Sequence, residues 1–144
     1  MSEDLIKEYC IQGTAESGMD VETAWNVGKA LADWLQTAGN VVVVYDASQQ
    51  QLATAIMEGI RLQGRNVVDG GIGDSELAVR HISALGLSGA AVVSFNQATA
   101  VISIEIFKED GARIEGAGLQ EMHALVEAGN FVPAAVKGEL TAIA

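Results

Sequence analysis

The sequence contains very little cysteine, proline and aromatic residue, and it has no long hydrophobic run. One cysteine and one proline occur in 144 residues, and aromatic residues make up 5%. A single cysteine excludes a disulfide within the chain and fits a reducing compartment. No apolar run approaches the roughly 18 to 20 residues that a membrane helix requires. The acidic start at Met1 to Asp4 is not typical of a signal peptide. We therefore expect a cytoplasmic domain with no membrane partner.

Basic side chains are scarce as well. Eight lysines and arginines stand against nineteen acidic residues, which leaves a formal net charge of −11. A polyanion is repelled by such a field, so we expect no nucleic-acid partner. The same field opposes a sugar phosphate unless basic residues gather at its site. The hydrophobic content of 49% excludes a disordered chain, and the length fits one domain.

One stretch, 89–104, contains no charged residue, no histidine and no cysteine. Its first half, Gly89 to Ser94, predicts a buried strand of the kind found in parallel sheets. Because ligands in open α/β sheets bind beyond the carboxyl ends of the strands, we look for a site just after it. The candidates there form a neutral hydrogen-bonding set: Ser94, Asn96, Gln97 and Thr99. Hydrogen bonding within the loop itself explains these four residues equally well.

The periodicity of the rest predicts alternating helices and strands. We expect helices over 21–35, from near Ser48 to Gly64, over 75–85 and over 119–128, and strands over 41–45, 66–69, 89–94 and 101–107. Asp20 is the expected N-cap of the first helix, and Ser48 with Gln51 fits a capping box for the second. The alternation predicts a three-layer α/β/α domain with a mainly parallel, mixed sheet, in which the last strand is antiparallel and lies at the edge.

This pattern predicts one domain over 1–144, with an arm over 1–19, a core over 20–131 and a tail over 132–144 to which no secondary structure is assigned.

Gly70 to Gly73 is expected to form a flexible turn rather than an anion-binding loop, because Asp74, Ser75 and Glu76 follow it and it has no phosphate-binding glycine pattern.

Other side chains could in principle bind a metal or take part in catalysis, but each has a simpler structural interpretation. Asp46, Asp74 and Glu76 have the oxygen ligands that a hard cation prefers, but helix capping by Asp74 and a solvated turn at Asp46 are the favoured interpretation. We expect no metal site and no cofactor. His81 lies on an apolar helix stripe and is expected to be half-buried, whereas His123 is expected to face solvent.

Several short motifs, in order along the chain, resemble the N-terminal domain of the α-D-phosphohexomutases (phosphomannomutase/phosphoglucomutase). Tyr9-Cys10-Ile11-Gln12-Gly13 resembles the family's Y-D-I-R-G arm, and Gly28 to Ala32 its G-R-A-L-G helix segment. Val41 to Ser48 is similar to V-V-V-G-R-D-x-R, and Gly59 to Gly71 to G-L-x-x-x-G-x-x-V-x-D-x-G. The resemblance spans about Tyr9 to Phe131 and implies an α/β/α domain of a sugar-phosphate mutase.

The chain departs from the family at its functional positions. In the family, the serine of T-A-S-H-N-P carries the phosphoryl group; a gapless frame places that serine on Phe95 and the histidine on Asn96. A shifted frame places the serine on Ser94 and the histidine on Phe95. Phenylalanine has no nucleophilic atom, and Ser94 has no base near it in sequence.

The basic residues of the family motifs are also missing. The arm's arginine is Gln12, the arginine after the strand aspartate is Ser48, and the P-T-P turn reads Asp74-Ser75-Glu76. Asp46 and Ser48 join the candidate ligand-binding residues because they stand at the family's strand–turn motif. Phosphoryl transfer depends on cationic stabilisation of negative charge, so the sequence predicts no catalytic residue and no activity of this chain alone.

Three functions remain open. The leading hypothesis is a stand-alone mutase-like domain that binds another protein or a second copy of itself. A second is a mutase subunit or fragment completed by domains on another chain, and a third is a sensor of a small ligand at Ser94 to Thr99. Sugar phosphate is a weakly supported ligand.

Overall fold

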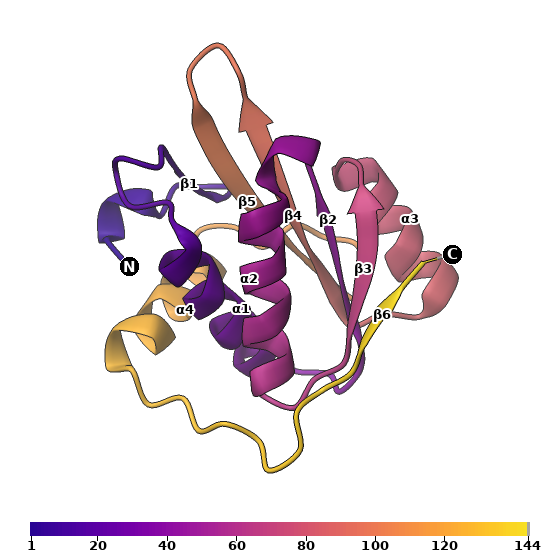
Figure 1. Ribbon diagram of the computed structural model, residues 1–144. Helices are drawn as coiled ribbons and strands as arrows, with labels where there is room; N and C mark the ends of the chain where they lie inside the picture. Colours follow the sequence, from indigo (N-terminus) through magenta and orange to yellow (C-terminus); the bar gives the residue numbers. More distant parts are fainter. Residues whose placement is uncertain (144) are drawn as a thin grey trace.

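The computed structural model describes residues 1–143, in which a six-stranded sheet is covered by helices on both faces (Figure 1). The chain runs through these elements: η1 (Glu3–Leu5), β1 (Ile11–Gly13), α1 (Val21–Trp34), β2 (Val41–Tyr45), η2 (Ala47–Gln49), α2 (Gln50–Leu62), β3 (Val67–Ile72), α3 (Ser75–Leu85), β4 (Gly89–Asn96), β5 (Val101–Lys108), α4 (Ala117–Ala128) and β6 (Leu140–Ala142).

The strand order is β1-β5-β4-β2-β3-β6. Strand β2 pairs in parallel with β3 and β4, and β6 pairs in parallel with β3. Strand β5 is antiparallel to both β4 and β1. The mainly parallel, mixed α/β sheet predicted from sequence is therefore confirmed. Its antiparallel end is closed by the three-residue β1, so β5 is the second strand from the edge rather than the edge itself.

Two apolar cores lie on the two faces of the sheet. The larger core joins α1, α2 and α4 to the sheet through residues such as Val41, Val43, Ala91 and Ile104. The smaller core joins α3 to residues with the opposite parity, among them Val42 and Val92. This division follows from the alternation of side chains along a strand, and it matches the arrangement of helices in Figure 1.

Helices α1 and α2 approach each other at two glycines. A Cβ built on Gly28 would lie 2.2 Å from the carbonyl oxygen of Ile56, and one on Gly59 would lie 2.2 Å from that of Trp25. Side chains at these positions would push the two backbones apart. The glycines therefore set the spacing of α1 and α2, which cover the face of the sheet that carries the larger core.

Local capping was predicted correctly at two helices and wrongly at a third. The carboxylate of Asp20 accepts a hydrogen bond from the backbone N–H of Thr23, and Asp74 accepts one from Leu77. The predicted capping box at Ser48 and Gln51 does not form. Helix α2 begins at Gln50 with no side-chain cap, because a short 3-10 turn, η2, intervenes.

Three segments extend or add strands beyond the prediction. Strand β3 continues through Gly70 and Gly71, where a turn was predicted, because a register shift opposite Val43 and Val44 absorbs the extra residue as a bulge. Gly71 has a φ of 77°, which a glycine tolerates. Strand β4 continues to Asn96, which pairs with Val101 of β5.

The tail also forms a strand, which the sequence prediction left unassigned. After α4 it passes the C-terminal end of α2, where the N–H of Ala134 donates to the carbonyl of Leu62 at 2.9 Å. It then forms β6 beside β3 (Figure 1). All three residues of β6 are exposed, so the strand lacks the apolar alternation that would reveal it in sequence.

His81 is half-buried, as predicted. The prediction for His123 was wrong: its side chain is only 14% exposed, and Nε2 lies 3.0 Å from the carbonyl oxygen of Met1. The docked N-terminus supplies this contact, which helix periodicity alone does not show. Across residues 1–143, no helix is long and apolar enough to cross a membrane.

Candidate functional site

The carboxyl ends of the parallel strands β2, β3 and β4 lie at one edge of the sheet. Asp46 follows β2, Asp74 follows β3, and the hairpin over 97–100 follows β4. The six predicted ligand-binding residues are all found near this edge, but the structure divides them. Ser94, Asn96 and Thr99 share a hollow, Asp46 and Ser48 form a separate pair, and Gln97 lines neither.

The hollow beside the β4–β5 hairpin has a volume of about 280 Å³. Seven residues line it: Gln12, Ser94, Phe95, Asn96, Thr99, Val101 and Ser103. The amide of Gln12 donates to the hydroxyl of Ser103 at 3.0 Å, and Asn96 Oδ1 accepts from the N–H of Ala98 at 3.0 Å. Within residues 1–143 no ionisable side chain lines this hollow, so its chemistry is that of neutral hydrogen bonds.

Asp46 and Ser48 form hydrogen bonds with each other. The hydroxyl of Ser48 donates to Asp46 Oδ1 at 2.6 Å, and its backbone N–H donates to the same oxygen at 2.9 Å. These two bonds favour the charged form and lower the pKa of the Asp46 carboxyl below its ordinary value. Asp74 thus caps α3, the role favoured for it over cation binding, whereas Asp46, for which a solvated turn was favoured, caps η2. Among the described residues, no three His, Cys, Asp or Glu side chains are grouped to hold a metal ion.

Neither frame of the phosphoserine motif places a reactive group in the hairpin. Phe95 is partly buried and packs against the larger core. Ser94 is exposed on the opposite face of β4, directly across from Ser103. In the described chain its hydroxyl has no hydrogen-bond partner among the side chains, so no base is in place to take its proton.

Cys10 lies half-buried on the arm, next to the edge strand. Burial raises the pKa of its thiol, and the nearby carboxylate of Glu105 raises it further. The thiol therefore stays protonated near neutral pH.

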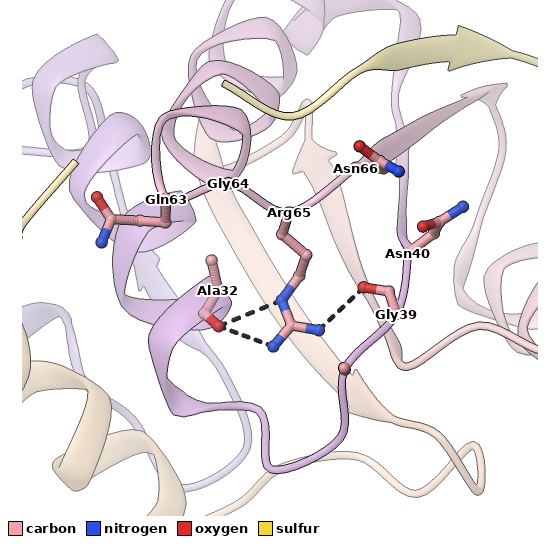
Figure 2. Close-up of a pocket in the computed structure, with 8 residues that line it drawn as sticks. Ala32, Gly39, Asn40, Gln63, Gly64, Arg65 and Asn66 are labelled. Carbon is pink, nitrogen blue, oxygen red and sulfur yellow. Dashed lines mark hydrogen bonds between the residues drawn. The ribbon is translucent and has the colours of Figure 1, made fainter. Parts of the chain in front are cut away.

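Five of the eight basic side chains are engaged elsewhere in the fold. Arg65 shows this most clearly, at the opposite edge of the sheet (Figure 2). Its guanidinium donates to the carbonyl oxygens of Ala32, Leu35, Thr37 and Gly39, at and beyond the C-terminal end of α1. The adjoining pocket of about 370 Å³ is therefore lined by an arginine whose donors are already used.

The other four engaged bases form ion pairs or stack on aromatic rings. Arg61 and Lys137 pair with Glu58, and Arg113 pairs with Glu105 and Glu115. The ammonium of Lys29 lies 3.7 Å from the ring centroid of Trp25. These contacts hold the tail and the β5 edge in place, so they remove cations from any ligand site.

Three bases remain: Lys7, Arg80 and Lys108. Arg80 is exposed on α3, and Lys108 ends β5 away from the hairpin. Lys7 lines a small hollow on the arm that shares Gln12 with the candidate site. Sequence reasoning missed this residue, because only the return of the arm onto β5 brings it near.

A larger cavity of about 630 Å³ lies on the other side of the hairpin and was also missed. It is bordered by the loop over 14–20 with the first residue of α1, the start of α2 and the β4–β5 hairpin. Phe95 and Thr99 line both this cavity and the smaller hollow. No single sequence motif marks it, because its walls come from three segments far apart in the chain.

The chain matches the family described as phosphoglucomutase/phosphomannomutase, alpha/beta/alpha domain I, over residues 3–132. A phosphomannomutase of Vibrio cholerae is 28% identical over an alignment of 144 positions that covers 92% of this chain and 30% of that protein. A phosphomannomutase of Salmonella typhimurium is 27% identical, covering 88% of this chain and 28% of that protein. The chain thus spans less than a third of these relatives.

Solved structures agree on the fold. A phosphoglucomutase/phosphomannomutase family protein from Burkholderia thailandensis superposes with a TM-score of 0.80 at 23% identity, covering 99% of this chain and 33% of that one. The phosphoglucomutase pp63/parafusin from Paramecium superposes with a TM-score of 0.66 at 12% identity, covering 95% of this chain and 26% of that one. The extent of the family match shows that this chain belongs to the phosphoglucomutase/phosphomannomutase family, as an α/β/α domain I.

Proposed function

We propose that this chain is a binding domain built on the mutase domain I fold and that it carries out no phosphoryl transfer by itself. One observation carries this proposal: at the carboxyl edge, the phosphoserine position falls on partly buried Phe95 or on Ser94, and neither has a base or a cation beside it. Phosphoryl transfer requires a nucleophile and positive charge placed around the transferred group. The edge offers neither.

Its expected partner is another protein. Several large apolar side chains are exposed in the described chain, and four of them belong to the tail: Val132, Val136, Leu140 and Ile143. Exposed apolar area of this kind is typical of an interaction surface. The net charge of −11 opposes the approach of two identical copies. A basic partner therefore fits this domain better than a second copy, although a dimer remains a measurable alternative.

Two measurements test the proposal. The chain incubated with a hexose 1-phosphate is expected to produce no hexose 6-phosphate in ³¹P NMR spectra; conversion by the chain alone would overturn the proposal. Light scattering after size exclusion, over a wide range of concentration, gives the molar mass. A stable dimer would identify self-association as the mode of binding, whereas a monomer at every concentration would direct the search to a separate protein.

A second function is favoured by a different observation. The chain aligns along most of its length with phosphomannomutases of which it spans only about 30%. A mutase fragment completed by other domains would give this alignment, and those domains would supply the missing cations. The test is complementation: the chain is mixed with a Vibrio cholerae phosphomannomutase that lacks the aligned segment. Activity that appears only in the mixture would favour this function over the first.

A further inference from the structure

The larger cavity combines an apolar floor with an acidic mouth. Met19, Leu52 and Ile102 are almost completely buried and line it together with partly buried Phe95. Two carboxylates, Glu16 and Asp20, also line the cavity and are exposed to solvent, so they stand at its opening. Neutral side chains make up the remainder of the wall, and no base of residues 1–143 takes part in it.

These two carboxylates have free hydrogen-bonding capacity. Asp20 accepts one hydrogen bond, from the N–H of Thr23 at 2.9 Å, through Oδ1. Glu16 forms no ion pair and no side-chain hydrogen bond within the described chain. Within the described chain, Asp20 Oδ2 and both carboxylate oxygens of Glu16 accept no hydrogen bond, so these acceptors are free for a ligand. An anionic group, such as a phosphate, would be repelled at this opening.

A basic side chain has the complementary shape and charge. Lysine and arginine carry a long aliphatic stem that packs on apolar surface, while the charged head stays at the polar boundary. The stem would lie against Met19, Leu52 and Phe95, and the head would reach Glu16 and Asp20. The net charge of −11 adds a long-range field that draws such a group toward the domain.

We infer that this cavity is a docking site for a lysine or arginine side chain presented by a protein partner. The inference rests on the proposed binding function and names the chemistry of its partner. It assigns a role to the loop over 14–20 and to the face of the hairpin that carries Phe95. The loop residues do not line the smaller neutral hollow around Ser94, which shares only Phe95 and Thr99 with the larger cavity.

The test uses NMR titration of the whole chain with the peptide acetyl-Leu-Lys-Leu-amide. We expect shifts of the methyl groups of Met19 and Leu52, and at least several-fold weaker binding of the same peptide with an acetylated lysine. The double substitution Glu16→Gln/Asp20→Asn should weaken binding of the lysine peptide by about threefold to tenfold, because exposed ion pairs contribute modestly to affinity. Asparagine keeps the helix cap at position 20, so the fold is preserved. High salt should weaken binding of the lysine peptide to the wild-type chain.

The matched control is Glu109→Gln/Asp110→Asn, which removes the same charge at the far end of the hairpin. There too an aspartate accepts a backbone hydrogen bond, from Ala112, beside a free glutamate. This control should bind the lysine peptide almost like the wild type. Equal binding of the lysine and acetyl-lysine peptides, shifts that map elsewhere, or no binding would overturn the inference. A dimer seen by light scattering would still stand in that case, so the two proposals fail separately.

Discussion

The two edges of the sheet use charge in opposite ways. At the amino edge, partly buried Arg65 donates five hydrogen bonds to four backbone carbonyls at and beyond the end of α1, and Figure 2 shows those to Ala32 and Gly39. At the carboxyl edge, where ligands bind in open α/β sheets, the hairpin around Ser94 is neutral and the flanking turns carry Asp46 and Asp74. Five of the eight basic side chains serve the architecture of the fold, and within residues 1–143 none lines the hollow at the ligand edge.

This contrast supports the proposal that the chain keeps the domain I fold without carrying out phosphoryl transfer by itself. The fold depends on apolar strands, on the close approach of α1 and α2, and on local caps. Each of these survives changes at the carboxyl edge. The resemblance to the family motifs implies two arginines and a serine there, and this chain holds Gln12 and Ser48 in place of the arginines and Phe95, or Ser94 in the shifted frame, in place of the serine. The predictions that follow test each edge separately.

The largest effect is expected from Arg65→Met. It leaves the carbonyls at the end of α1 without a donor in a partly buried site, which should lower the free energy of unfolding by about 3 kcal/mol. Urea unfolding followed by circular dichroism measures this. Arg80→Met, at an exposed arginine on α3, is the control and should stay within about 0.5 kcal/mol of the wild type. Equal effects of the two substitutions would show that the amino edge is not held by Arg65.

A smaller loss of stability toward unfolding is expected from Asp74→Ala at the carboxyl edge. The substitution removes the N-cap of α3, which accepts from Leu77, and should cost about 1 kcal/mol. Asp74→Asn should keep most of the wild-type free energy of unfolding, because asparagine caps a helix equally well. If both variants unfold like the wild type, then Asp74 does not cap the helix in solution.

The Asp46 and Ser48 pair predicts a pH effect. Because two hydrogen bonds from Ser48 lower the pKa of the Asp46 carboxyl in the fold, the pair adds stability above the unfolded pKa, which is about 3.9, and this is lost as the pH falls through the lower folded pKa. Ser48→Ala should raise the pKa of Asp46 in a carboxyl NMR titration. It should change stability at neutral pH only slightly, because Ser48 is not the cap of α2. An unchanged pKa would contradict the pairing.

The smallest effect is expected from Ser94→Ala. The hydroxyl is exposed and bonds to no side chain within residues 1–143, so the free energy of unfolding should stay within about 0.5 kcal/mol. The lysine peptide should also bind unchanged, because Ser94 faces away from the larger cavity. A large change in either quantity would show that Ser94 has a role that the structure does not reveal.

The sequence predicted what local physics determines. The strand over 41–45 and the helix over 75–85 were predicted with their observed ends, and the caps at Asp20 and Asp74 were identified, because periodicity and capping act within a few residues. Non-local features were missed. Strand β6 depends on pairing with β3, the extension of β4 depends on β5, and His123 depends on the docked N-terminus. The larger cavity likewise requires the arm, α2 and the hairpin together, so no single segment of the sequence predicts it.

The most direct test is whether the chain accepts a phosphoryl group. The purified chain is incubated with a hexose bisphosphate, and its intact mass and tryptic peptides are measured by mass spectrometry, with Ser94→Ala as the control. The neutral hollow around Ser94 predicts an unmodified mass for both proteins. A phosphoryl group on Ser94, present in the wild type and absent from the variant, would contradict the proposal that this edge carries out no phosphoryl transfer.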